Sequence, residues 1–235
     1  MFFSKPAPEF SKISAPTAAE ICAQSKPSPQ GKALLKPGMT PGQYQSALEK
    51  NKLPVDSVHF LAHGMQPKDS VCWACQSSRM AGPKLSGPEM DALKSTEAWL
   101  KNPSPSMHAS MAASLGKVDF TGPGSWAAQA GVWSGAPAAP GLPAVNLTAA
   151  AVAGAVMLAA GLKVGAPMPA VPKPKPSLPM APAKPQMPQM PQALQKPQTP
   201  AAPAIPVVDQ PKLVKMLSPF IDRGKGVANG SVSCT

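Results

Sequence analysis

The chain has 235 residues, of which 33 are proline and 18 are glycine, so much of it cannot form regular secondary structure. Aromatic residues make up 5% and charged residues 14%, which limits the core to a small one built from Ala, Val, Leu and Met. A net charge of +11 favours acidic partners. Because the lysines are scattered and no Arg-rich or aromatic-interleaved patch occurs, we expect no specific nucleic-acid binding.

The cysteines do not have the spacing of a disulfide framework, because two of them share one helical turn and the others are remote in sequence. They are Cys22, Cys72, Cys75 and Cys234. The N-terminus reads MFFSKPAPEFSKIS and has no apolar stretch after a basic start, so we expect no secretory signal. These features predict a reducing compartment, the cytoplasm.

Helix signals begin after an N-terminal arm, residues 1–14, that we predict to be disordered. Thr17 can cap a first helix, with Glu20 as its capping-box partner three residues later. Thr40 can cap another helix that has Pro41 at its first position.

Residues 53–80 are the densest stretch of apolar, aromatic, His and Cys residues. Apolar residues recur at helical spacing until Gly64 and Pro67 break the pattern, and a second helix capped by Asp69 or Ser70 can then follow. Two short helices joined by a tight turn predict a helical hairpin. The expected core or interaction residues lie in this hairpin and in a later tryptophan-containing helix: Phe60, Leu61, His63, Trp73, Cys75, Trp126 and Trp133.

Four possible metal ligands occur in the hairpin. His59 and His63 are spaced i, i+4, and Cys72 and Cys75 form a CxxC pair, so on facing helices they could make a tetrahedral zinc site. No glycine-rich knuckle surrounds the cysteines, and a buried Cys75 beside a hydrogen-bonded core histidine explains the pattern without a metal. We therefore expect no cofactor, with zinc as the alternative.

The same residues raise two catalytic alternatives. The CxxC pair has the spacing of a thioredoxin-type redox motif, but that motif needs a βαβ context that the surrounding sequence lacks. A nucleophilic dyad of Cys75 and His63 has no evident oxyanion loop and no orienting group. We therefore expect that the protein is not an enzyme.

Further helices are predicted downstream of the hairpin. Residues 86–89 open one that ends at Asn102, and residues 104–115 form the next, with His108 exposed. The segment SWAAQAGVW places its two tryptophans on one helical face, which is typical of core residues.

Residues 147–162 form an uncharged, Ala-rich run. A bilayer crossing needs about 20 strongly apolar residues, and this run is shorter and rich in Ala, Gly and Thr. We therefore predict a buried helix, capped by Asn146 and closed by Gly165, and no transmembrane span.

Residues 166–211 are dense in Pro, with Lys, Gln and Met, and Asp209 is their only acidic residue. This composition predicts a disordered, extended, polyproline-II-like linker whose lysines could contact an anionic surface weakly. Its PKPKP motif resembles the basic Pro-rich ligands of domains with aromatic grooves. Residues 212–230 recover helical spacing, interrupted by Pro219, and form a helix that either packs back on the domain, as we expect, or docks on a partner.

Several sequence blocks resemble an uncharacterised, mostly proteobacterial family known only as a domain of unknown function. The blocks are VHFLAHGM followed by KDSVCWAC, WAAQAGVWSG, LTAAAVAGAVMLAA and IDRGKGVANG. The resemblance implies an all-helical domain that includes the last helix, with the Pro-rich segment as an insertion. Such an insertion is tolerated because the free energy of closing a loop grows only slowly with its length.

The resemblance also bears on the metal site. His63 and Cys75 match positions of the family pattern, whereas His59 and Cys72 stand where Arg and Trp are usual, so a four-ligand site would be peculiar to this chain. The family brings no activity and no catalytic residue. Its members resemble accessory genes of secretion loci, of type VI in particular.

The sequence thus predicts an all-α protein, a compact multi-helix bundle of short helical hairpins over residues 15–165. The arm precedes this domain, and the linker and the C-terminal helix follow it. We expect a non-enzymatic interaction or adaptor protein of bacteria, accessory to a secretion or envelope machine, with a protein partner. The alternative is a small metal- or thiol-dependent protein that uses the four candidate ligands.

Overall fold

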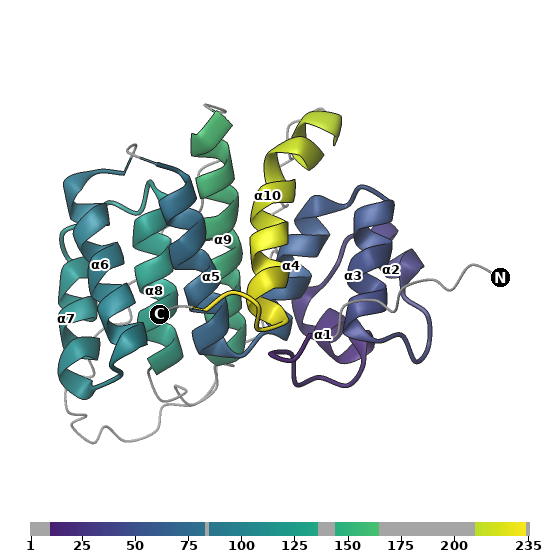
Figure 1. Cartoon of the computed structure of the whole chain (residues 1–235), viewed down its shortest axis with the longest axis horizontal. Coiled ribbons are helices and arrows are strands. Elements are labelled where there is room, and N and C mark those ends of the chain that lie inside the picture. The colour runs from purple at the N-terminus through teal and green to yellow at the C-terminus, as the bar shows by residue number, and fades with distance from the viewer. Residues whose placement is uncertain (1–9, 83–84, 136–143, 165–209, 234–235) are drawn as a thin grey trace, which may run out of the picture.

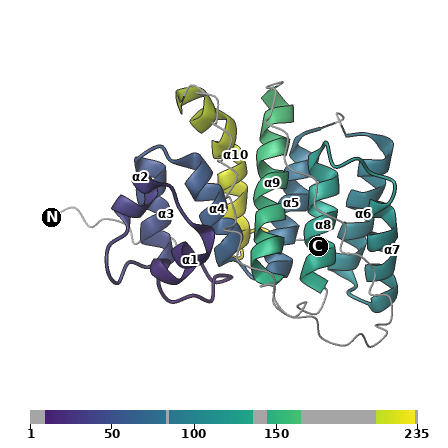
Figure 2. The same cartoon turned by 180° about the vertical axis from the view of Figure 1, so that it is seen from behind.

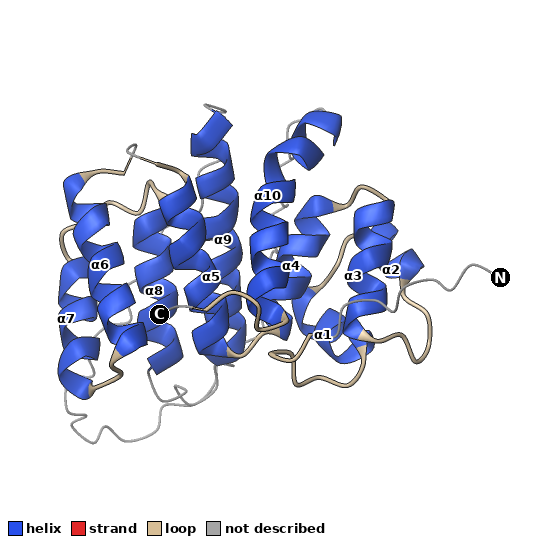
Figure 3. Cartoon of the chain, viewed as in Figure 1, coloured by secondary structure: helices blue, strands red, loops and turns tan. Residues whose placement is uncertain are grey.

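The computed structural model of the chain describes residues 10–82, 85–135, 144–164 and 210–233. These residues form ten α-helices and no strand apart from an isolated bridge between Ile13 and Met65, which confirms the all-α fold class (Figure 3). The helices are α1 (Ala18–Ser25), α2 (Pro29–Leu34), α3 (Pro41–Lys50), α4 (Pro54–Gly64), α5 (Pro67–Met80), α6 (Gly87–Lys101), α7 (Pro105–Leu115), α8 (Pro123–Gly135), α9 (Ala144–Val164) and α10 (Gln210–Ala228).

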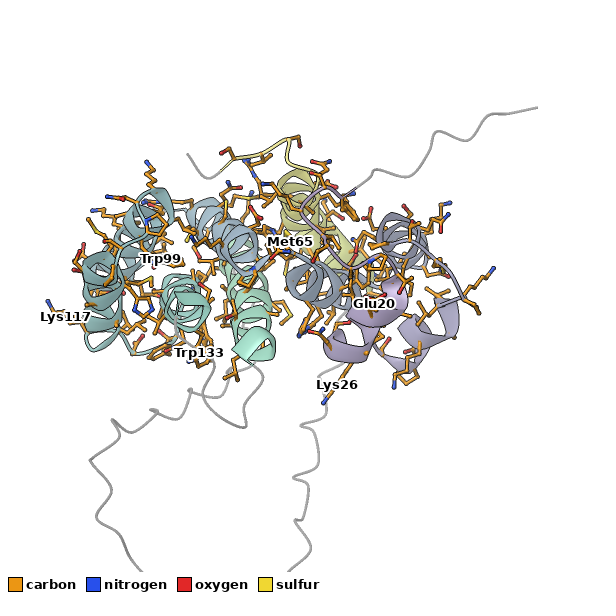
Figure 4. The ribbon with its side chains drawn as sticks, turned by 90° about the horizontal axis from the view of Figure 1, so that it is seen from below. Glu20, Lys26, Met65, Trp99, Lys117 and Trp133 are labelled. Atoms are coloured by element: carbon orange, nitrogen blue, oxygen red, sulfur yellow. The ribbon has the colours of Figure 1, made fainter. Side chains whose placement is uncertain are left out.

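The helices lie side by side in two groups that meet at α10 (Figures 1 and 2). Helices α1–α4 make one group and α5–α9 the other. Helix α10 packs against α4 of the first group and against α5 and α9 of the second. Seen from below, the buried Met65 lies between the two groups, whereas Lys26 and Lys117 point outward (Figure 4). The C-terminal helix therefore joins both halves of the body.

The main core is built around α9, which packs on α5, α8, α4 and α10. Val152, Ala153 and Val156 are fully buried, together with most of the other apolar residues of this helix. A helix that is apolar on nearly all sides is one that is buried on most of them, and its small side chains let neighbouring backbones approach closely. None of the helices formed by the described residues combines the length and apolar character that a bilayer crossing requires.

The predicted ends of this helix are partly corrected. Asn146 lies within the first turn of α9 instead of capping it, because the helix begins at Ala144. The predicted end at Gly165 lies outside the described residues.

A smaller core lies between α1, α3 and α4. The rings of Tyr44 and Phe60 lie with their centroids 4.9 Å apart, in a tilted arrangement. The Tyr44 hydroxyl donates to the Gly31 carbonyl oxygen at 2.8 Å, so this buried polar group is satisfied. The contact ties α2 to α3.

The helix starts confirm the predicted cap at Thr40 and correct parts of two others. Thr40 makes the predicted capping box and Pro41 the first position of α3. Thr17 is the N-cap residue of α1 as predicted, but the predicted capping box is not formed, because the Thr17 hydroxyl donates to the Glu20 carboxylate at 2.9 Å instead of accepting a backbone N–H. Helix α5 starts at Pro67, before the predicted caps Asp69 and Ser70. Proline suits the first position of a helix, because the backbone N–H that it lacks would have no partner within the helix there.

The body begins before the predicted domain boundary. Phe10 is 6% exposed and belongs to the main core. The Lys12 N–H donates to the Ala228 carbonyl oxygen at 2.8 Å, and the Lys12 carbonyl oxygen accepts from the Gln66 N–H at 3.2 Å. Residues 10–14, assigned to the arm from sequence, are therefore fixed between the end of α10 and the α4–α5 turn.

Helix α10 is continuous through Pro219, where the sequence predicted an interruption. A proline inside a helix removes one backbone hydrogen bond and costs about 3 kcal/mol. Pro219 itself is exposed, while its neighbours Phe220 and Ile221 and the preceding Met216 and Leu217 are buried. Burial of four large apolar side chains, about 1.5–3 kcal/mol each, outweighs that cost.

Candidate functional site

The two candidate histidine ligands lie one helical turn apart on α4. The His63 ring donates through Nδ1 to the His59 carbonyl oxygen at 2.8 Å, and the two ring centroids are 6.2 Å apart. This bond leaves Nε2 of His63 as the acceptor nitrogen in the neutral ring. His63 is thus held by its own helix.

Both histidines are half-buried, and burial lowers the pKa of each ring. In His59 the positive charge of His63 lowers the pKa further. Desolvation disfavours the charged form of an imidazole, so both rings are neutral near pH 7.

The two cysteines of the CxxC pair differ in state. Cys72 is disulfide-bonded, whereas Cys75 is a free, buried thiol. The pair therefore does not form the redox disulfide that its spacing allows, and Cys72 takes part in a disulfide although the cysteine spacing did not indicate a disulfide framework. Burial raises the pKa of the Cys75 thiol, and the nearby Glu97 carboxylate raises it further, so Cys75 is a weak nucleophile.

The structure does not assemble the four candidate ligands into one set. Within the residues that it describes, no group of three or more His, Cys, Asp or Glu side chains lies close enough to hold a metal ion. A sulfur already in a disulfide is not a thiolate ligand. The zinc alternative stays a prediction without support from this geometry.

A pocket of about 250 Å³ lies between α5, α6 and the tail that follows α10. Its walls include both cysteines of the pair, Gln76, Leu100, Lys101 and Ser233. The Gln76 side-chain amide donates to the Ser233 carbonyl oxygen at 3.0 Å and contacts Cys72 Sγ at 3.4 Å. The pocket therefore has one wall made by the C-terminal tail.

Two buried carboxylates serve the starts of helices. Asp56 accepts from the N–H of Ser28 at 2.9 Å and from its hydroxyl, just before α2. Glu89 is 4% exposed, accepts from the Ser125 hydroxyl at 3.3 Å and lies against the backbone at the start of α8. Carboxylates favour helix N-termini because the backbone N–H groups there carry partial positive charge. Both groups thus have structural partners.

Four of the seven predicted core or interaction residues lie in the main core, one lies in the smaller core, and one packs at the edge of the main core: Leu61, Trp73, Cys75 and Trp126, then Phe60, then Trp133. Trp73 is fully buried, and its indole N–H donates to the Phe220 carbonyl oxygen at 2.9 Å. Phe60, Leu61, Cys75 and Trp126 are also buried, whereas His63 and Trp133 are half-buried.

His108, expected to be exposed, is half-buried at the contact of α7 with α8. Its Nε2 donates to the Val132 carbonyl oxygen at 2.9 Å, and its ring lies edge-on to Trp99. No local sequence signal marks this contact, because it depends on how α7 packs.

The end of α9 and the start of α10 lie at the same end of the body (Figures 1 and 2). Near that end the Lys163 ammonium lies 5.7 Å from the centroid of the Phe220 ring. Leu162 and Leu213 are partly buried against the main core. The two helix ends that flank residues 165–209 in the sequence therefore lie at one end of the body.

A family model described as "Family of unknown function (DUF6931)" matches residues 44–171, more than half of the chain. The chain belongs to DUF6931. This confirms the resemblance to a family of unknown function. The DUF6931 match starts inside α3 and contains α4–α9, so α10 lies outside it although it packs into the same core. No curated protein and no solved structure matches the chain.

Proposed function

We propose that this chain is a non-enzymatic interaction protein of the adaptor type. Its helical body is the docking unit, and residues 165–209, here called the Pro-rich loop, reach a second protein. One observation carries the proposal: α9 and α10 pack in the same body, with the end of α9 and the start of α10 at one side, so both ends of the segment between them are fixed.

Helix α10, which follows the Pro-rich loop in the sequence, is firmly held in the body. Besides the bond from Trp73 to the Phe220 carbonyl, Lys225 of α10 makes ion pairs of 2.9 Å with Glu49 of α3 and with Asp222. A surface pair of this kind contributes at most about 1 kcal/mol, so the buried apolar face of α10 holds it in place. Both helices that flank the Pro-rich loop are thus fixed in the body.

The composition of the Pro-rich loop suits recognition by another protein. Proline restricts the backbone before binding, so less conformational entropy is lost in the complex. Four lysines and one acidic residue give the loop a positive charge: Lys173, Lys175, Lys184, Lys196 and Asp209. A groove with aromatic side chains and an acidic rim is the partner surface of matching chemistry.

The buried ionisable side chains already have structural roles, which supports a function without catalysis. Asp56 and Glu89 serve helix starts, and Cys75 is a thiol held neutral by burial. General acid–base catalysis needs a titratable group within hydrogen-bond reach of a substrate, and these groups are enclosed by the protein. The resemblance to accessory genes of secretion loci supports a place beside a cytoplasmic part of a secretion or envelope machine.

The proposal is tested by a photo-crosslinking amino acid placed at Ser177 within the loop, with the same group at the exposed Ala112 of α7 as the matched control. We expect crosslinking in the native cell to give one dominant protein partner from Ser177 and a weaker signal from Ala112. Equal crosslinking from both positions, or from neither, would rule out the loop as the binding element.

A second variant separates the loop from the body. Residues 167–207 are replaced with a short Gly/Ser linker, which leaves α9 and α10 intact. We expect this variant to keep its helical circular dichroism and lose the partner. Retention of the partner by the shortened chain would assign binding to the helices.

A further inference from the structure

The histidine pair on α4 has ring nitrogens that make no hydrogen bond within the described part of the chain. There, neither nitrogen of His59 has a partner, and Nε2 of His63 has none. Both rings are half-buried, and residues four positions apart lie on the same face of a helix. Val58 and Leu61 turn another face of α4 into the main core. The packing of α4 therefore leaves the two imidazoles side by side without a structural use for these nitrogens.

The hydrogen bond that His63 does make is of the kind that metal-binding histidines make. Its Nδ1–H donates to the His59 carbonyl oxygen at 2.8 Å, which leaves the lone pair of the neutral ring on Nε2. A histidine that binds a metal ion almost always donates its second ring nitrogen to a carbonyl, a carboxylate or water, which fixes the tautomer and the orientation of the ring. His63 has this arrangement before any ion binds.

The two rings are close enough to share one ion. Their centroids lie 6.2 Å apart, and their planes differ by 30°. Metal–imidazole bonds of about 2.0–2.1 Å require the two coordinating nitrogens to lie within about 4 Å of each other. Rings on one helix face reach this separation by turning about their side-chain bonds, and the i, i+4 spacing is the one that supplies two histidine ligands in helical zinc sites.

The charges around the pair favour a cation. The Asp56 carboxylate lies in the first turn of α4, and its negative charge favours positive charge at the His59 ring. This carboxylate is held by the N–H and the hydroxyl of Ser28, so it is a fixed charge beside the pair and not a third ligand. Burial keeps both rings neutral near pH 7, which is the form of imidazole that binds a metal.

We propose that His59 and His63 form an exchangeable site for one divalent late-transition-metal ion, such as Ni²⁺ or Zn²⁺, whose other coordination positions are open to water. Imidazole suits these ions, whereas Mg²⁺ and Ca²⁺ take oxygen ligands. The cysteines take no part, since Cys72 is in a disulfide and Cys75 is a buried thiol. Structural zinc sites are closed by four protein ligands, whereas a site with open positions binds a further ligand and releases its ion more readily. The site is independent of the Pro-rich loop.

The site is tested by calorimetric titration of Ni²⁺ into the full chain, prepared without an affinity tag and freed of metal with a chelator. We expect one equivalent to bind and Mg²⁺ not to bind. His59→Gln and His63→Gln should each weaken binding at least about tenfold, because loss of a ligand costs at least as much as loss of a group that only orients one.

His108→Gln is the matched control. This residue is also a half-buried histidine, but its Nε2 is occupied by the Val132 carbonyl oxygen, so the Ni²⁺ affinity should stay unchanged. No binding of Ni²⁺ by the unmodified chain would overturn the site. Unchanged affinity in both His59→Gln and His63→Gln would place the ion elsewhere and overturn it equally.

The ring nitrogens themselves give a second readout that needs no variant. The chain has three histidines, so their ¹⁵N resonances are few enough to follow during a Zn²⁺ titration. We expect Nε2 of His63 and one nitrogen of His59 to shift, His108 to stay, and a chelator to restore the original spectrum. A shift of His108 alone, or no histidine shift at all, would contradict the assignment. A zinc ion that the chelator cannot remove would mean a closed site with further ligands, and not the open pair proposed here.

Discussion

Gly224 of α10 faces the indole ring of Trp73 on α5. A Cβ atom built there would lie 2.6–3.0 Å from three ring atoms, closer than real contacts allow. The same indole donates its N–H to the Phe220 carbonyl of α10. Glycine at this position therefore sets how closely the C-terminal helix approaches the body.

Gly224→Ala should lower the free energy of unfolding by about 1–2 kcal/mol, measured by urea denaturation. Overpacking a rigid ring costs more than the gain of about 1 kcal/mol in helix propensity. Gly87→Ala is the matched control, because nothing lies within 4 Å of the added carbon and a change within about 0.5 kcal/mol is expected. Unchanged stability of Gly224→Ala would show that Trp73 can shift without loss.

The histidine pair on α4 should make stability depend on pH. Burial lowers the pKa of His59 and of His63 in the folded protein, so below about pH 6.5 the unfolded chain binds protons first. The free energy of unfolding should therefore fall as the pH decreases from 6.5 towards the lowered pKa values. Above pH 6.5 the two histidines should no longer make the free energy of unfolding depend on pH. The measurement is urea denaturation at pH 8, 6.5 and 5.5.

The double variant His59→Gln/His63→Gln should flatten this pH dependence while keeping stability at pH 8 within about 1–2 kcal/mol. An equally steep decrease in the double variant would mean that other groups cause it. A zinc content near one equivalent in the unmodified chain would restore the metal alternative for this site.

At the level of helices, α9 shows how an Ala-rich segment becomes the centre of a fold. Its side chains are short, so α4, α5, α8 and α10 can pack against it. Ala155 is fully buried, whereas Ala150 on the same helix is exposed. Because both residues are alanines in one helix, a substitution at the two positions differs mainly in whether the new side chain is buried or exposed.

Ala155→Leu should reduce the free energy of unfolding by at least about 2 kcal/mol, because the added volume has no space in a packed interior. Ala150→Leu should change it by no more than about 0.5 kcal/mol. Thermal unfolding followed by circular dichroism measures both. Equal effects of the two variants would mean that α9 is not enclosed as described.

The presence and approximate position of the helices could be predicted from the sequence, because capping residues and apolar spacing are local signals. Ser86 and Ser104 cap α6 and α7 through their own side chains, and the Thr40 box needs only residues three positions apart. The burial of Phe10 and of His108 could not be predicted in this way, because each depends on helices remote in sequence.

The candidate site was less predictable than the fold for the same reason. The spacing of His59, His63, Cys72 and Cys75 allows a zinc site, yet spacing does not say which faces of α4 and α5 meet. The pocket wall formed by Ser233 had no sequence signal, since that residue lies far from Cys72 in the chain.

For the whole molecule, α10 closes the body by joining its two groups of helices. Met216, Leu217, Phe220 and Ile221 are buried in the main core. Burial of four such side chains contributes several kcal/mol, a large share of the 5–15 kcal/mol that holds a typical domain folded. The body described here therefore depends on a helix outside the DUF6931 match.

A chain ending at Val164 should not unfold cooperatively and should bind a hydrophobic dye, because the loss of α10 exposes Trp73 and its neighbours. The chain with the shortened Pro-rich loop is the control, since it retains α10 and should melt in one cooperative transition. A cooperative transition at the original Tm in the truncated chain would show that α10 is dispensable.

The adaptor proposal rests on the loop that this closed body presents, and equilibrium affinity tests it most directly. The partner identified by crosslinking from Ser177 is titrated against the full chain and against the chain with residues 167–207 replaced, at the same salt concentration. We expect the replacement to weaken binding by about 100-fold, or 2.7 kcal/mol, with the circular dichroism spectrum unchanged. Equal affinity for the two chains would mean that the helical body, not the Pro-rich loop, recognises the partner.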